Sequence, residues 1–139
     1  MKEILVVPPW LVHRHLPDSV SLQILDGDQK VIFSDSGKWL HPLLAAEEFL
    51  VQSNYDVTSL VLHDRIAGRA AAALTTRMGF KIVKASLMSQ LAISLYDAYQ
   101  IAYHADQLVE RIACQTEELI DVTMDLDMIH AMILLRATS

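Results

Sequence analysis

The sequence has little cysteine and no long apolar run, and each shortage excludes a class of protein. Cys114 is the only cysteine among the 139 residues. A single thiol rules out an internal disulfide and a zinc site made of cysteines alone, and it is typical of proteins of the reducing cytoplasm. No apolar run reaches the roughly 18–20 residues of a membrane span. We therefore expect a cytoplasmic protein with no membrane partner.

Positive charge is also scarce. Lysine and arginine total 11, against 17 aspartates and glutamates, which gives a formal net charge of −6. Nucleic-acid binding depends on clustered cations that neutralise phosphates. Because the cations here are scattered, we expect no nucleic-acid partner. Hydrophobic residues make up 53% of the chain, which favours a folded core over disorder.

The N-terminal part of the chain differs from the rest in its pattern. We predict an arm over residues 1–20, followed by a single domain over residues 21–139. The apolar part of the arm contains Pro8 and Pro9 and lacks a small-residue cleavage site, which argues against a signal peptide.

Two features of the arm allow more than one interpretation. Residues 4–7 are compatible with a short strand that the following prolines would end. His13 and His15 are either two ligands of a metal site or two exposed side chains. The second interpretation is favoured, because no third ligand is close in the sequence.

From residue 20 onward, the hydrophobic pattern alternates between strand and helix. Alternation at Val20, Leu22 and Ile24 predicts a strand, which a turn at residues 26–28 joins to a second strand at residues 30–33. A helix then begins at Pro42 and is followed by a buried strand through residues 60–62. The next helix runs from the N-cap Asp64 to Gly79. After it we predict a strand at 81–89, a helix capped by Ser89, a strand at 100–106 and mainly helix after Asp106.

The helix after residue 64 has an unusual body. Its residues Ala70–Ala73 carry no bulk, so this helix can approach a sheet or another helix closely. The complete order of elements is β-β-α-β-α-β-α-β-α. This order predicts an α/β fold, a three-layer α-β-α sandwich with a mixed sheet.

Four short segments carry a resemblance to a known family. They are "GKWLHPLL", "HDRIAGRAAAAL", "ASLMSQLA" and "CQTE". Together with the element order, they resemble a family of small prokaryotic domains of unknown function with a cytidine deaminase-like fold. The resemblance runs from about Ser21 to Leu119 and implies the cytidine deaminase-like form of the sandwich.

The residues that zinc-dependent deaminases need are missing from these segments. Such enzymes place His or Cys two residues before Glu at one helix start, and Pro-Cys-x-x-Cys at the next. Here Arg65 stands two residues after His63, and serines stand in "SLMSQ" where thiols are needed. We expect no metal, no cofactor and no zinc-dependent deamination.

The resemblance implies that the two helix starts meet at one edge of the sheet. Backbone N–H groups at such helix starts attract anions, arginines bind carboxylates or phosphates, and serines donate hydrogen bonds. The alternative is that these residues only cap helices or face solvent. The predicted ligand-binding residues are Asp64, Arg65, Gly68, Arg69, Ser86 and Ser89.

Catalysis has weaker candidates. Cys114 beside His104 would resemble a nucleophile with its base, although a lone buried cysteine is more often an apolar filler. Asp64 is the other catalytic candidate. The acidic residues from Glu117 to Asp127 are spread over a helix surface, which favours a solvated face over a metal site.

These observations lead to three hypotheses of function. The first is a binding domain without zinc for a small anionic or nucleoside-like molecule. The second is an enzyme of unassigned chemistry that uses Asp64, Arg65, Ser86 or Cys114, and the third is a structural or interaction domain. The C-terminal apolar stripe and the high apolar content favour a homo-oligomer under each hypothesis.

Overall fold

The computed structural model describes residues 5–112 and 124–138, and its centre is one five-stranded sheet. The strand order is β2-β1-β3-β4-β5. β1 is antiparallel to β2 and β3, whereas β3, β4 and β5 are parallel. The strands are β1 (Leu22–Leu25), β2 (Val31–Asp35), β3 (Val61–Ala67), β4 (Ile82–Ser89) and β5 (Ala102–Val109). An α/β fold with a mixed sheet is therefore confirmed.

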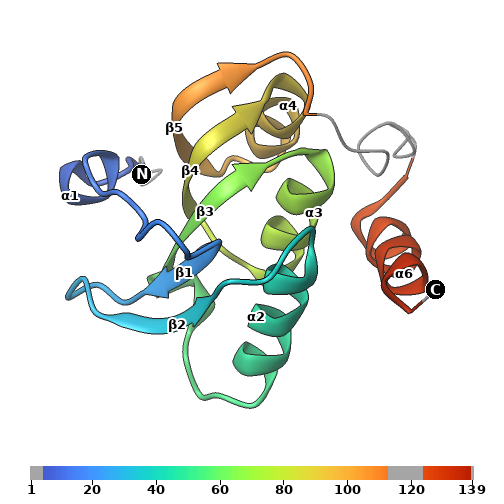
Figure 1. The fold of residues 1–139 in the computed structure, drawn as a ribbon, viewed down its shortest axis with the longest axis horizontal. Coiled ribbons are helices and arrows are strands. Elements are labelled where there is room, and N and C mark those ends of the chain that lie inside the picture. Colours follow the sequence, from blue (N-terminus) through green and yellow to red (C-terminus); the bar gives the residue numbers. More distant parts are fainter. Residues whose placement is uncertain (1–4, 113–123, 139) are drawn as a thin grey trace, which may run out of the picture.

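Helices lie on both sides of this sheet. α2, α3 and α4 cover one face, with α6 against the outside of α3, and α1 lies on the opposite face (Figure 1). The helices are α1 (Pro9–Val12), α2 (His41–Val51), α3 (Arg69–Met78), α4 (Gln90–Ala98) and α6 (Leu126–Ala137), with a 3-10 turn η1 (Val57–Ser59). Within the described residues, no helix is both long enough and apolar enough to cross a membrane.

The small side chains of α3 let it pack tightly. Ala70–Ala73 are all buried in the main core, as the sequence predicts. Gly79 ends the helix with a φ of 105°, a left-handed conformation that glycine adopts without strain. The starts of α4 and α2 also follow local signals: Ser89 Oγ accepts a hydrogen bond from Ala92 N at 3.1 Å, and Pro42 lies in the first turn of α2.

The start of α3 differs from the prediction. Asp64 lies inside β3 rather than at a helix N-cap, and Gly68 takes the N-cap position of a ten-residue helix. The reason is tertiary: the parallel pairing of β3 with β4 continues to Ala67 opposite Met88. Strand pairing thus outweighs the local capping preference of the aspartate.

Two further predictions about the ends of the chain are wrong. Residues 5–7 form no strand, and α1 begins at Pro9, whose fixed φ suits a first helical position. The chain is not helical from Asp106, because β5 continues beside β4 to Val109. Cys114 and Glu117 lie outside the described residues.

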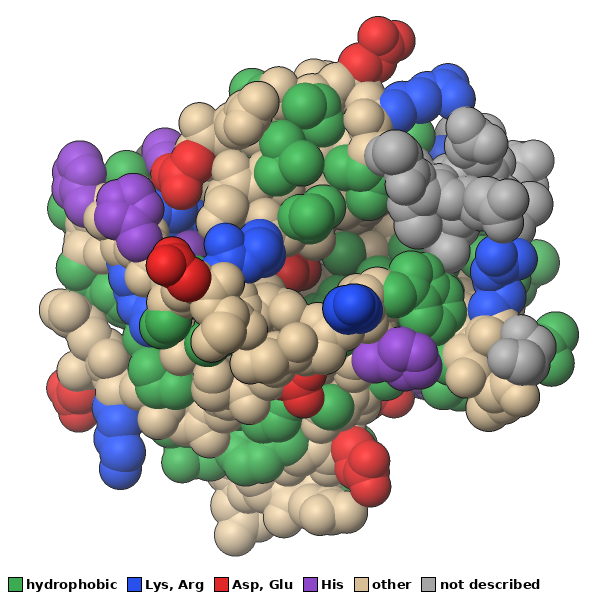
Figure 2. All heavy atoms as spheres, in the orientation of Figure 1, with side chains coloured by type: hydrophobic (Ala, Val, Ile, Leu, Met, Phe, Trp, Pro, Cys, Tyr) green, Lys and Arg blue, Asp and Glu red, His purple; other side chains and the backbone are tan. Residues whose placement is uncertain are grey.

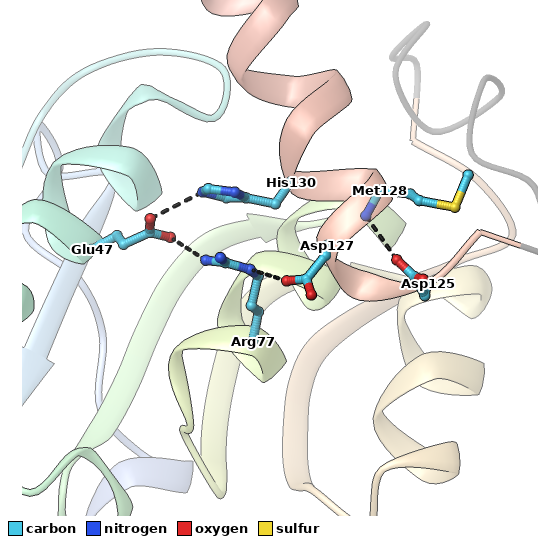
Figure 3. Close-up of polar contacts among 6 residues, drawn as sticks. All are labelled: Glu47, Arg77, Asp125, Asp127, Met128 and His130. Carbon is cyan, nitrogen blue, oxygen red and sulfur yellow. Dashed lines mark hydrogen bonds and ion pairs between the residues drawn. The ribbon is translucent and has the colours of Figure 1, made fainter.

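α6 is held against the core by apolar and polar contacts. Arg77 of α3 pairs with Asp127 at 2.9 Å and with Glu47 of α2 at 3.4 Å. His130 Nε2 lies 3.0 Å from a carboxylate oxygen of Glu47 (Figure 3). Below this network, Ile133 is completely buried. Part of the predicted C-terminal apolar stripe therefore packs within the chain itself.

Two variants of α6 test this packing. Ile133→Ala removes a side chain of 0% exposure, so we expect a loss of about 2–4 kcal/mol in the free energy of unfolding. Leu135→Ala, in the same helix at 74% exposure, is the matched control and should change it by less than about 0.5 kcal/mol. Urea denaturation measures both, and equal losses would contradict the described docking of α6.

Candidate functional site

A cavity of about 530 Å³ lies where β3 ends and α3 begins. Ligands of open α/β sheets commonly bind outside the carboxyl ends of the strands, which is where this cavity is. Figure 2 shows a hollow near the centre of this face, with hydrophobic side chains around it. The walls are mostly apolar, and the lining residues are Trp39, Leu40, Ile66, Gly68, Ala70, Ala71, Leu87, Val109, Arg111 and Ile112.

A second cavity of about 260 Å³ adjoins the first. Both cavities share Trp39, Leu40 and Ile66 as lining residues. The smaller cavity adds polar residues to its lining, among them Asp64 and Arg65. A ligand across the two cavities would therefore meet an apolar chamber at one end and a less apolar chamber at the other.

Asp64 is the most perturbed acid beside these cavities. Its side chain belongs to a residue only 8% exposed. Burial raises the pKa of Asp64 to about 7, although the backbone N–H groups of Arg65 and Ile66 and the charge of Arg65 lower it. The carboxyl group therefore divides between its neutral and ionised forms near pH 7. A strongly perturbed acid in a cleft is a candidate for a functional role.

Trp39 stands at the boundary of both cavities in a strained conformation. Its φ is 57°, in the left-handed region that bulky residues rarely adopt. Such strain costs on the order of 1–3 kcal/mol and is concentrated at functional sites. The ring of His41 meets the indole edge-on, with 5.3 Å between centroids. The indole, on a residue 38% exposed, is thus held where a ligand can reach it.

The six predicted ligand-binding residues divide into two groups. Asp64, Arg65 and Gly68 line the adjoining cavities. Arg69 lines a different cavity of about 380 Å³ beside α4 and α6. The other two lie elsewhere: Ser89 is buried at the start of α4, and Ser86 belongs to β4 and lines none of these three cavities. The structure therefore brings together Asp64, Arg65 and Gly68, and it separates them from Arg69 and from the two serines.

Arg65 has a structural task in addition to its place in the cavity wall. Its Nε donates to Val20 O at 2.9 Å, and its Nη2 donates to Pro17 O at 2.8 Å. These bonds tie the segment before β1 to β3. Arg65 therefore holds against β3 the segment that leads into Ser21, a lining residue of the smaller cavity.

His63 lies on the other face of the sheet, because successive strand residues point to opposite faces. Its Nδ1 accepts a hydrogen bond from Arg14 Nη1 at 2.7 Å, and Arg14 also donates to the side chain of Gln23. Burial, followed by the charges of Arg14 and Lys84, lowers the pKa of His63 to about 3. The side chain of His63 is therefore directed away from the cavities, and no aspartate, glutamate or cysteine among the described residues joins it in a group that could hold a metal ion.

Lys84 fastens the arm to this second face. Its residue is 0% exposed, and its Nζ donates to Val12 O at 2.6 Å and to Arg14 O. Asp106 neutralises the ammonium at 3.3 Å. His13 and His15 are exposed beside these contacts, and among the described residues no three metal-ligating side chains are grouped to hold an ion.

Sequence reasoning did not identify the residues that form most of the larger cavity. Trp39 lies in a turn, Ile66 in a strand end and Arg111 after β5, so no shared motif connects them. Most of the lining residues fall in the segments "GKWLHPLL", "HDRIAGRAAAAL" and "ASLMSQLA", on which the family resemblance rests, but of these residues the sequence assigned a binding role to Gly68 alone.

Comparisons with known proteins find a similar fold but no match in sequence. No protein-family model and no curated protein matches the sequence. Among solved structures, the crystal structure of a DUF1893 family protein (TM1506) from Thermotoga maritima has a similar fold, with a TM-score of 0.73 and 21% identity. The match covers 84% of this chain and 80% of that chain. At this identity the similarity shows the fold alone.

Replacing Asp64 with Asn tests the buried carboxyl group. The folded-state pKa of about 7 lies above the ordinary 3.8, so the folded state binds more protons between these values and loses stability as the pH rises through them. From about pH 4 to about pH 7, we expect wild-type protein to lose on the order of 3 kcal/mol relative to Asp64→Asn.

Urea denaturation at several pH values measures this difference. His63 titrates in an overlapping range with the opposite sign, but it is present in both proteins and cancels from the comparison. A difference between wild type and variant that stays constant with pH would show that Asp64 is not buried as described.

Proposed function

We propose that the protein is a zinc-free binding domain with a three-layer, cytidine deaminase-like fold that holds a small anionic or nucleoside-like molecule in the adjoining cavities. The observation that carries this proposal is the pair of cavities at the end of β3, with Asp64 buried in one wall and Trp39 strained between them. The strand order and the family resemblance support the deaminase-like assignment. Residues 21–139 form the proposed domain, with residues 1–20 as its arm.

The residues that line the two cavities indicate which chemical groups the ligand would have. The apolar chamber of about 530 Å³ suits a planar ring, and the indole of Trp39 offers a face for stacking. Asp64 can donate a hydrogen bond when neutral and accept one when ionised. Arg111 lines the same chamber, and its guanidinium can bind a phosphate or carboxylate.

A second candidate function has one observation in its favour. A general acid or base works best when its pKa is near the operating pH, and the pKa of Asp64 is about 7. An enzyme that uses Asp64 for proton transfer is therefore the alternative. Turnover of a bound nucleoside that disappears in Asp64→Asn would favour the enzyme, and binding without turnover favours the binding domain.

Tryptophan fluorescence tests the binding proposal directly. The chain has two tryptophans, so a Trp10→Phe background leaves the Trp39 signal alone. Titration with cytidine 5′-monophosphate should give a saturable change, because the base would stack beside the indole. Arg111→Gln should weaken the nucleotide about tenfold and leave cytidine itself unchanged, since one charge-assisted hydrogen bond is lost.

The control variant is Lys81→Gln, an exposed residue just before β4, at the end of the strands away from the cavities. It should bind like the background protein. If no nucleoside or nucleoside 5′-monophosphate changes the Trp39 signal, the nucleoside-like ligand is rejected.

A further inference from the structure

β5 forms one edge of the sheet, and no described strand pairs with its outer side. In Figure 1 it is the outermost arrow beyond β4. The strand is eight residues long and contains neither proline nor lysine, the residues with which proteins commonly block an open edge. A long edge of this kind is a template for another strand.

The hydrogen bonds to β4 show which backbone groups of β5 face outward. Ala102 N donates to Lys81 O at 2.9 Å, and the parallel register with β4 continues without a shift to Val109. In a parallel ladder, alternate residues bond to the neighbouring strand. The even-numbered residues therefore bond to β4, and the N–H and C=O groups of residues 103, 105 and 107 point away from the sheet.

We propose that two copies of the protein pair through β5 as antiparallel strands, with Ala105 opposite Ala105 of the second copy. In this register residue 103 of each chain faces residue 107 of the other, and their outward backbone groups form the hydrogen bonds. His104 then lies opposite Asp106 twice, once on each side of the two-fold axis. Those are non-hydrogen-bonded pairs, in which opposing side chains are closest.

Charge and hydrogen-bond geometry select this register over its neighbours. A slip of two residues in one direction places Asp106 opposite Asp106, and in the other direction His104 opposite His104. Directly opposed carboxylates repel each other, and two opposed imidazoles lose the carboxylate that each His104 meets in the proposed register. A slip of one residue brings the outward groups against groups that are already bonded to β4.

Apolar surface supports the same arrangement. Leu108 is 60% exposed on the edge strand. In the proposed register it faces Ala102 of the second copy, a large side chain against a small one. The pairing is isologous, so it closes as a dimer rather than growing into a fibre. It does not depend on the proposed ligand, because residues of one chain line both cavities.

Molar mass in solution tests this interface. Light scattering coupled to gel filtration should give twice the 15.6 kDa chain mass for wild type. Ala105→Pro should give a single chain with an unchanged circular-dichroism spectrum, because its N–H is not needed by β4 and proline is tolerated on the open side of an edge strand.

A charge exchange tests the register without proline. His104→Asp places aspartates opposite each other and should dissociate the dimer. Adding Asp106→His exchanges the two side chains, keeps a carboxylate beside Lys84 and should restore the dimer. This pair of variants decides the outcome if Ala105→Pro fails to fold.

Three results would overturn the proposal. The first is a wild-type mass of one chain at the highest soluble concentration, which would leave the edge to a different partner. The second is a dimer that persists in both Ala105→Pro and His104→Asp, which would place the interface elsewhere. The third is a dimer that the charge exchange does not restore, which would reject the register.

Discussion

The pairing of β3 with β4 is the constraint on which the candidate site depends. This ladder continues beyond Asp64 to Ala67, so the backbone of residues 64–67 stays in the sheet. The helix that follows cannot begin before Arg69, and Gly68 becomes its N-cap. As a result, the carboxyl group of Asp64 remains among core side chains instead of capping a helix at the surface. The cavities form in the space between the strand end and the displaced helix start.

The same pairing gives two neighbouring residues opposite environments. His63 and Asp64 are both buried, and they lie on opposite faces of the sheet. Burial disfavours the charged form of each group, so it lowers the pKa of the histidine to about 3 and raises that of the aspartate to about 7. The N-terminal arm covers the face of the sheet that bears His63, where its residue Arg14 donates a hydrogen bond to the histidine. The cavities lie on the face that bears Asp64, and the proposed ligand is therefore placed there.

The two proposals use different parts of one sheet and meet at a single strand. The ligand would occupy the helix-covered face, whereas the second copy would occupy the outer edge of β5. Val109, the last residue of β5, also lines the larger cavity. A partner strand at this edge would therefore hold one wall of the cavity in place without contributing a side chain to it.

The sequence by itself determined the order of the elements after residue 20 and three of their boundaries, because the signals at Pro42, Gly79 and Ser89 act within one turn of the chain. It also determined the close packing of α3, since alanines leave room wherever the helix lies. Tertiary structure alone decided the place of Asp64 and the cavity walls. Those depend on strand pairing and on residues far apart in the chain, such as Trp39 and Arg111, and no local pattern records which distant segments will meet.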